Sequence, residues 1–572
     1  MKELIAKLLK EAIEEVGKDT NFKIEEKEIE NNLTFPPNTS MGDYAFPCFF
    51  LESRIKISPS DLANYIREKF INLPKGISRV QTAGPYINFF LDRKEMTKNV
   101  IKRVLLLGDN YGKIPQKEKI NTMVEFPGPN TNKPLHIGHL RNMSLGESVS
   151  RISQFNGEKV IRANLNNDKG IHICKSMAAY KFYGKNKNPP KKIKSDHFVG
   201  QFYAMFSQRE KKNQKLELES HHLLQKWEEG DKETIELWKK MNNWALAGLQ
   251  ETYKRFGISL DKEYYESQIY EKGKKIILEG LEKGLFKKDK EGNIIIDLST
   301  EGLDEKVLLR SDGTSVYITQ DIYLAKLKFD EFKLNKSIYV VGNEQDYHFK
   351  VLFNILEKLG FKNEGLKHLS YGMVFLPSGK IKSRESTKGV SADEIIDKVQ
   401  ELVKKELKSR YKLSKKELEE RSLKISLGAI KYMLLKVDAK KNMIFNPKEA
   451  ISFEGDTGPY LQYTYARASS ILKKAKNKKK SFNVKELHEK EINLIKKISS
   501  FEEVVKNSYK NLNPSLIANY SYQLAQIFNE FYHTCPVVGS KNEGFRLSLV
   551  EATKQTLKNA LNLLGIEVLE KM

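Results

Sequence analysis

The fold of this chain is decided by the stretch Val124–Leu140, which reads VEFPGPNTNKPLHIGHL. It opens with strand character over Met123–Phe126 and then passes through three prolines and a glycine, which exclude regular structure. A helix is predicted over Leu140–Phe155, ended by Asn156-Gly157. A strand, a tight turn and a helix N-terminus together present backbone N–H groups and the positive end of the helix dipole to a phosphate.

Two histidines, His136 and His139, lie at the predicted mouth of this helix with Gly138 between them. Two imidazoles can donate hydrogen bonds to a polyphosphate while negative charge develops on it. Because Gly138 has no side chain, a flat nucleotide base could lie against the backbone there. The alternative is a plain strand-to-helix turn whose histidines only cap the helix, since so short a motif recurs by chance.

The composition favours a water-soluble protein of several domains. A chain of 572 residues predicts about three or four domains, and no run approaches the roughly 18 apolar residues that a membrane helix needs. The first residues, MKELIAKLLKEAIEEVGKD, predict an amphipathic helix and not a signal peptide. Three widely spaced cysteines, Cys48, Cys174 and Cys535, argue against a disulfide framework and a structural zinc site.

The net charge of +24 and the pI of about 9.4 indicate a polyanionic partner, above all a nucleic acid. A lysine-rich composition spread over solvated faces would explain part of the same excess. The charge therefore supports nucleic-acid binding only together with the motifs.

Polar residues follow two further predicted strands. The strand that begins at Val160 is followed by Asn166, Asn167 and Asp168, and the strand Ile338–Val341 is followed by Gln345 and His348. The carboxyl ends of parallel strands meet at one edge of an open sheet, so these residues are expected to face the same crevice as the histidines. Ordinary polar loops remain the alternative for each residue taken singly.

Acidic residues occur in apolar surroundings between these strands. Glu266 follows Tyr264-Tyr265, and Tyr317 and Asp321 are four residues apart, which places both on one face if a helix begins there. A pocket role suits Asp321 better than a surface role, given its apolar neighbours.

A basic segment, LPSGKIKSREST at residues 376–387, carries Lys380, Lys382 and Arg384 between small residues. Such a loop can close on a triphosphate and move as pyrophosphate leaves. An exposed basic turn with no such role is the alternative.

Helical patterns dominate two regions of the chain. In the first, from about 185 to 260, all three tryptophans fall at spacings that suit packing between helices. The second begins near Ser391 and continues to the end; in it Tyr460, Tyr463 and Arg467 share one helix face. Aromatic and basic groups on one face suit unstacked RNA bases, although the tyrosines could equally pack between helices.

Four stretches now identify a family: SMGDYAF, FPGPNTNKPLHIGHLRN, YVVGNEQDYHF and EGDTGPYLQYTYAR. With the C-terminal stretches FNEFYHTCPV and RLSLVEATKQTLKNALNLLGIEVLEKM, they make nearly the whole chain resemble the arginyl-tRNA synthetases of class I. The sequence HIGH alone would indicate only the class.

The resemblance implies an α/β Rossmann-type catalytic domain at residues 116–395, with a helical insertion at about 185–260. It also implies an N-terminal tRNA-contacting α/β domain at 1–115 and an all-α anticodon-binding domain at 396–572. The implied reaction uses ATP with Mg²⁺ to convert L-arginine to arginyl-adenylate, and then transfers arginine to tRNA(Arg). The family usually needs bound tRNA for the first step. A cytoplasmic monomer that does not bind membranes is expected.

The resemblance also implies site residues. The catalytic residues would be His136, His139 and Lys382, and the ATP-binding residues His136, Gly138, His139, His348, Lys380, Lys382 and Arg384. Arginine would be bound by Asn130, Glu266, Tyr317, Asp321 and Gln345, and tRNA by Tyr460, Tyr463 and Arg467; no metal ligand is expected. The loop departs from the KMSKS form of the class, so the cation that replaces its second lysine stays open, with Lys382 preferred.

Three other functions compete with this one. Two pocket carboxylates speak against another class I synthetase, because apolar amino acids and glutamate would not use them. A small-molecule nucleotidylyltransferase would not need a long basic helical tail. A non-catalytic RNA-binding paralogue would be expected to have lost His136, His139 or the cationic loop.

Overall fold

The computed structural model describes residues 2–34, 36, 41–115, 118–362, 365–377, 390–475, 481–482 and 486–572. The chain divides into two compact units. The first comprises Met1–Leu107, Ala475–Ser499 and Glu530–Ala552, and the second Gly108–Lys474, Ser500–Asn529 and Thr553–Met572.

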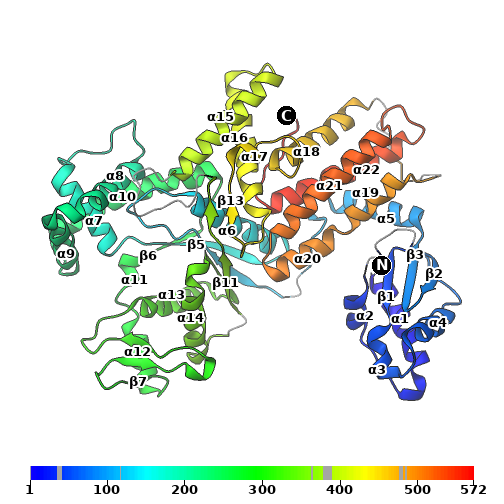
Figure 1. Ribbon diagram of the computed structural model, residues 1–572, viewed down its shortest axis with the longest axis horizontal. Coiled ribbons are helices and arrows are strands. Elements are labelled where there is room, and N and C mark those ends of the chain that lie inside the picture. Colours follow the sequence, from blue (N-terminus) through cyan, green and yellow to red (C-terminus); the bar gives the residue numbers. More distant parts are fainter. Residues whose placement is uncertain are drawn as a thin grey trace. The chain divides into compact units, whose positions relative to one another are not determined.

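The first unit contains a three-stranded antiparallel sheet covered by helices (Figure 1). Its strands, in the order β1-β3-β2, are β1 (Tyr44–Pro47), β2 (Ile77–Ala83) and β3 (Tyr86–Leu91). Its helices include α1 (Lys2–Val16), α2 (Glu26–Asn32), α3 (Glu52–Ile55), α4 (Pro59–Glu68), α5 (Arg93–Leu107) and α19 (Glu489–Ser499). The amphipathic pattern predicted for the N-terminus is confirmed, because Ile5, Leu9 and Ile13 of α1 are fully buried in the core of this unit.

The second unit is built on a five-stranded parallel sheet in the order β11-β10-β4-β5-β6 (Figure 1). The strands are β4 (Asn121–Glu125), β5 (Lys159–Asn166), β6 (Lys262–Tyr265), β10 (Lys336–Gly342) and β11 (Leu366–Tyr371). From β4 the chain adds β5 and β6 on one side, and then β10 and β11 on the other. The switch point between β4 and β10 therefore opens a crevice at their carboxyl ends, as in a Rossmann-type fold.

Helix α6 (Ile137–Phe155) follows β4 and begins three residues before the predicted start. The reason is local, since the His136 side chain caps the helix and supplies an acceptor that the sequence pattern of apolar residues does not reveal. The predicted end is confirmed, with Asn156 at the C-cap and Gly157 at a φ of 99°. Asn142 of α6 donates a 2.7 Å hydrogen bond to the Val340 carbonyl, which fixes the helix against β10.

A helical insertion lies between β5 and β6, as the sequence predicts. It contains α7 (Ile171–Tyr183), α8 (Ser195–Arg209), α9 (Gln214–Glu228) and α10 (Lys232–Phe256). The packing interpretation of the tryptophans holds, because Trp227 meets Trp238 edge-on at 5.4 Å and Trp244 packs against Tyr180 and Phe198.

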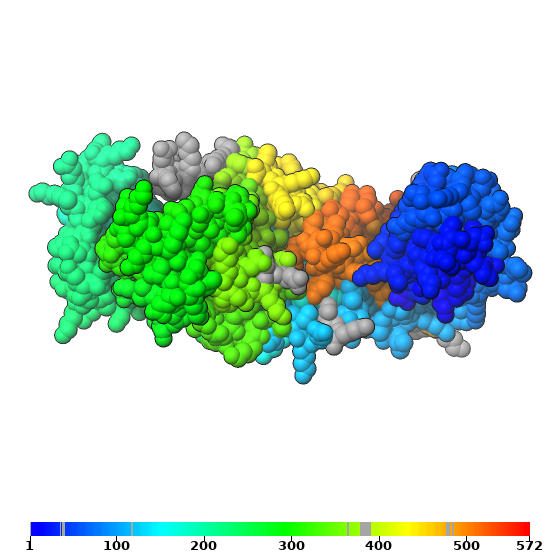
Figure 2. All heavy atoms as spheres, turned by 90° about the horizontal axis from the view of Figure 1, so that it is seen from below, coloured from blue at the N-terminus to red at the C-terminus, as the bar shows by residue number. Residues whose placement is uncertain are grey.

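A small antiparallel sheet between β6 and β10 was not foreseen from the sequence. It comprises β7 (Lys287–Lys288), β8 (Ile294–Ile296) and β9 (Lys306–Leu309). Helices α11 (Glu266–Ile269) and α12 (Lys274–Glu282) precede it, and α13 (Tyr317–Phe332) follows it. The strands are too short to show a clear alternation of apolar residues. Figure 2 shows this part of the chain in bright green, but the three isoleucines of β8 are buried beneath its surface.

The remaining part of the chain is mainly helical. The helices are α14 (Asp346–Lys358), α15 (Ala392–Arg410), α16 (Lys415–Leu435), α17 (Pro447–Ala450), α18 (Gly458–Lys474), α20 (Phe501–Asn511), α21 (Ser515–Thr534) and α22 (Glu543–Leu563). One short parallel pair joins β12 (Val374–Phe375) to β13 (Met443–Ile444). Within the described part of the chain, no helix has both the length and the apolar character needed to cross a membrane.

Candidate active site

The two histidines form one unit at the N-terminus of α6. The His136 Nδ1 atom accepts a 3.1 Å hydrogen bond from the Gly138 N–H, and the His139 Nδ1 atom accepts one of 3.2 Å from the His136 N–H. Their ring centroids are 4.1 Å apart. Since both Nδ1 atoms accept, the neutral tautomer of each ring carries its proton on Nε2 and presents an N–H donor there.

Both rings are neutral at physiological pH. Burial, together with the nearby Lys133 ammonium, lowers the pKa of His136 to about 4. Burial and the two neighbouring groups His136 and Lys133 hold the pKa of His139 well below its usual value. The pair therefore offers hydrogen-bond donors to phosphate but no positive charge.

Gly138 has a second reason to lack a side chain. A Cβ atom at this position would lie 2.9 Å from Cε1 and 3.0 Å from Nδ1 of His136. The absence of a side chain at Gly138 therefore makes room for the His136 ring at the helix N-terminus.

The turns after β4 and β5 are joined by hydrogen bonds. Asn130 forms an isolated parallel bridge with Asn167, and the Asn167 N–H donates 2.9 Å to the Pro129 carbonyl. The Gly128 N–H donates 3.0 Å to the Asn164 side chain. The polar turn 166–168 therefore lies beside the segment 127–136 that leads into α6, which we call the histidine turn, and Asn130 pairs with it directly.

Glu266 begins α11 directly after the carboxyl end of β6. Burial raises the pKa of its carboxyl to about 7, and the neighbouring Asp168 carboxylate adds to this rise. Asp168 is itself buried and accepts hydrogen bonds from the Ser267 N–H at 2.9 Å and the Ser267 hydroxyl at 2.7 Å. The sequence placed Asp168 only in a polar turn. Its contact with the Glu266 segment, 99 positions away, depends on the pairing of β5 with β6.

Helix α13 begins at Tyr317, which confirms that Tyr317 and Asp321 lie one turn apart. The Asp321 Oδ2 atom lies 2.7 Å from Nε2 of His348, which stands on α14. The residue expected to bind arginine and the one expected to bind ATP are thus adjacent. Tyr317 is 77% exposed, and Gln345, directly before α14, is also exposed, so both side chains are accessible to a ligand.

The basic segment expected to contain Lys380, Lys382 and Arg384 lies outside the described residues. The chain that follows it is joined to the histidine turn. Ser391 forms an antiparallel bridge with His136, and the Ala392 N–H donates 2.8 Å to the Leu135 carbonyl. The backbone after the basic segment therefore contacts the backbone of a candidate catalytic residue.

The expected tRNA-binding residues form one cluster on α18. The Arg467 guanidinium lies 4.9 Å from the centre of the Tyr463 ring and donates a 2.5 Å hydrogen bond to Asn529 of α21. Asn529 in turn donates 2.7 Å to the Tyr460 hydroxyl. All three side chains are half-buried, so each both packs against a neighbouring helix and presents part of its surface to solvent.

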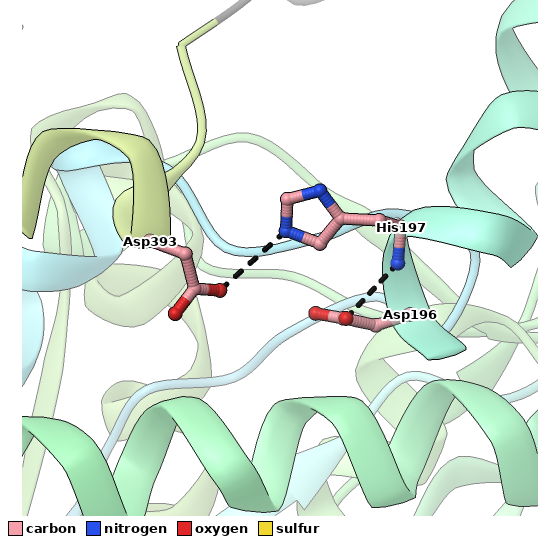
Figure 3. Close-up of side chains that lie close together, drawn as sticks. All are labelled: Asp196, His197 and Asp393. Atoms are coloured by element: carbon pink, nitrogen blue, oxygen red, sulfur yellow. Dashed lines mark hydrogen bonds and ion pairs between the residues drawn. The ribbon is translucent and has the colours of Figure 1, made fainter. Parts of the chain in front are cut away.

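Asp196, His197 and Asp393 lie close enough together to hold a metal ion (Figure 3). A lysine already supplies the balancing charge, however. The Lys194 ammonium lies 3.1 Å from Asp196 and 2.8 Å from Asp393, and His197 lies 3.5 Å from Asp393. The group is best described as an ion-pair cluster that joins α8 to the first turn of α15.

Comparisons with known proteins agree with this arrangement. The family described as "tRNA synthetases class I (R), catalytic domain" matches residues 100–447. The "Arginyl tRNA synthetase N terminal domain" matches residues 3–91, and the "DALR anticodon binding domain" matches residues 461–572. The arginine–tRNA ligase of Treponema denticola is 44% identical over 99% of this chain and 98% of its own. That of Borreliella afzelii is 43% identical over 96% of each.

A solved structure supports the same assignment. The arginyl-tRNA synthetase of Thermus thermophilus superposes with a TM-score of 0.83 at 26% identity, covering 99% of this chain and 100% of that one. With full-length relatives of such similarity and a catalytic-domain match over more than half of its length, the chain belongs to the arginyl-tRNA synthetase family of class I.

Proposed function

We propose that this class I arginine–tRNA ligase forms arginyl-adenylate in the crevice between β4 and β10, and then transfers the arginyl group to tRNA(Arg). The use of ATP follows from the class. The observation that supports the proposal is that the His136–His139 pair follows β4, Glu266 follows β6, and Asp321 contacts His348 of α14, which follows β10 of the same parallel sheet.

The first step needs positioning more than proton transfer. The arginine carboxylate attacks the α-phosphorus and pyrophosphate leaves, so no general base is required. The Nε2–H groups of His136 and His139 donate to phosphate oxygens as charge develops. Gly138 leaves space at the helix N-terminus, and His348 borders the ATP and arginine subsites.

The phosphate charge must be balanced by groups other than the two histidines, because both rings are neutral. We assign this task to Lys382, with Lys380 and Arg384, and to Mg²⁺ that enters with ATP. Bound to phosphate oxygens, Mg²⁺ would withdraw charge from the leaving group.

The arginine side chain is a planar fork of N–H donors, so its recognition requires carboxylates at fixed angles. Glu266 and Asp321 supply them, with Tyr317 and Gln345 beside the side chain and Asn130 at the amino-acid head group. Lysine offers only a compact ammonium and would leave part of this pocket unsatisfied.

We further propose that residues 1–115 contact tRNA, that 116–395 with the insertion at about 185–260 hold the chemistry, and that 396–572 bind the anticodon. Tyr460, Tyr463 and Arg467 would contact tRNA from α18. The family matches at both ends of the chain support these domain functions. A cytoplasmic monomer is the state we assign.

ATP–pyrophosphate exchange with each of the twenty amino acids, with and without total tRNA, tests the function. Among the twenty amino acids, only arginine is expected to support exchange, and the rate with arginine should rise when tRNA is present. Exchange with another amino acid, or none under any condition, would contradict the proposal.

The pocket assignment is tested by Asp321→Asn. We expect the KM for arginine to rise about 30-fold or more, since a charge-assisted hydrogen bond is lost, while the KM for ATP stays within about twofold. Asp330→Asn is the matched control, because Asp330 lies on the same helix but pairs with Lys326 at the surface. Equal effects on arginine and ATP would show that Asp321 is not part of a side-chain pocket.

A further inference from the structure

Asp168 joins three parts of the second unit. Its carboxylate accepts both hydrogen bonds of Ser267, at the start of α11. Its backbone carbonyl accepts 2.7 Å from Nε1 of Trp238 and 3.3 Å from Nδ2 of Asn242, both on insertion helix α10. The side chain thus holds the end of β6, while the backbone of the same residue is held by the insertion.

The same network reaches the histidine turn. The Asn242 Oδ1 atom accepts a 2.5 Å hydrogen bond from the Thr131 hydroxyl, one residue after Asn130. Thr131, Asn242 and Asp168 are all buried. Because Ser267 directly follows Glu266, Asp168 fixes the position of Glu266 relative to the histidine turn.

We propose that Asp168 is a positioning residue of the arginine pocket: it orients Glu266 toward the guanidinium and, as a carboxylate beside it, sets the pH range in which the pocket accepts the cation. The proposal rests on the role proposed above for Glu266. It assigns a function to a residue that the reaction itself does not require.

The charged groups around Glu266 decide whether its carboxyl gains or loses a proton more easily than usual. Asp168 and Lys169 come from the turn after β5, and Asp321 comes from α13, where it is paired with His348. The Lys169 ammonium is shared, since it lies 3.1 Å from Glu228 and 3.2 Å from the centre of the Tyr270 ring. Negative charge therefore predominates at the carboxyl of Glu266.

Without bound arginine, the Glu266 carboxyl is protonated in part of the molecules near neutral pH, because its pKa is about 7. Arginine binds the ionised carboxylate, so its binding releases that proton and weakens as the pH falls below about 7. This loss of binding forms the acid limb of the pH profile of kcat/KM for arginine. Removing the Asp168 charge lowers the pKa of Glu266 and moves the acid limb to lower pH.

The test measures kcat/KM for arginine from pH 5.5 to 9 by pyrophosphate exchange, with saturating total tRNA present, in Asp168→Asn, Ser267→Ala and wild-type protein. For Asp168→Asn we expect the acid limb to move down by roughly half to one pH unit. At pH 8.5 we expect the KM for arginine to rise about tenfold, with kcat and the KM for ATP little changed. Ser267→Ala should raise the KM for arginine by a smaller factor and leave the limb in place, since the charge remains.

Asp261→Asn is the matched control. Asp261 also links β5 to the β6 segment, through a 2.8 Å hydrogen bond from the Arg162 N–H, but it does so before β6 begins. A purely structural effect of losing such a link would appear in this variant too, without any movement of the pH limb.

Glu266→Gln separates the two proposals. If it leaves the KM for arginine unchanged, the pocket assignment itself fails. If it raises that KM and abolishes the acid limb, while Asp168→Asn moves neither the limb nor the KM at pH 8.5, the inference about Asp168 is overturned and the proposed function stands. Should Asp168→Asn fail to fold, an unchanged KM for arginine in Ser267→Ala would overturn the positioning role.

Discussion

At the scale of single residues, one imidazole carries two functions. The His136 ring caps α6 through Nδ1, and this same hydrogen bond leaves the proton on Nε2 for a phosphate oxygen. The proposed contact with phosphate and the initiation of the helix are therefore coupled at this residue, and the cap explains why the helix begins earlier than its apolar pattern predicts.

Gly138→Ala should separate activity from stability. Alanine is a better helix former than glycine, and this gain offsets the capping hydrogen bond that a displaced His136 ring would lose, so the Tm is expected to change little. The added Cβ would meet the His136 ring at 2.9 Å and displace its Nε2–H, so kcat for pyrophosphate exchange should fall about tenfold or more. Calorimetry and exchange kinetics measure the two quantities. Full activity would show that the ring position is not critical.

At the scale of elements, the first turn of α15 is held from two sides. Its backbone bridges the histidine turn at Ser391, and the Asp393 carboxylate contacts Lys194, His197 and Thr252. Burial alone would raise the pKa of Asp393, but hydrogen bonds from His197 and Lys194 lower it below the usual value. The stabilisation by Asp393 is thus present at neutral pH and is lost as the solution becomes strongly acidic.

Asp393→Ala should lower the free energy of unfolding by about 3 kcal/mol at pH 7, because it leaves the half-buried Lys194 without its closest acid. Asp397→Ala is the control: Asp397 is exposed and pairs with Arg255, so a change within about 0.5 kcal/mol is expected. Urea unfolding measures both. Added Zn²⁺ should not raise the Tm, since Lys194 already balances the acids; a clear rise would show a metal site.

Substitutions on helix α18 are expected to affect tRNA binding. Arg467→Ala and Tyr463→Ala should each raise the KM for tRNA about tenfold and leave the KM for arginine unchanged, because both groups are half-exposed on one face. Aminoacylation kinetics provide the measurement. If instead the Tm falls and the KM for tRNA does not change, the packing interpretation of these side chains is correct.

At the scale of the whole molecule, a net charge of +24 is matched to a polyanion. Raising the salt concentration from about 50 to 200 mM should increase the KM for tRNA by about tenfold or more, since counterions are displaced on binding. The KM for arginine should change by less than about twofold, because the proposed pocket carboxylates of Glu266 and Asp321 are partly buried and weakly screened by salt. Equal salt effects on both substrates would indicate that the charge does not act on tRNA.

Much of the fold and of the site is local in origin and could be predicted. The strand–turn–helix around His136 and His139 follows from prolines, glycine and helix signals that lie within about 35 residues. The spacing of Tyr317 and Asp321 required only that a helix begin there, and it does. The small sheet β7–β9 was missed because strands of two to four residues carry too little periodicity.

The sequence by itself determined which chemical groups this protein has and which short segments present them. Only the tertiary structure decided which groups meet: Asp168 with Ser267 across the β5–β6 pair, Asp321 with His348 between two helices, and Asn242 of the insertion with Thr131. Local patterns report on neighbours a few residues away, whereas these contacts depend on the order of strands in the sheet, and that order is set by burial summed over the whole domain.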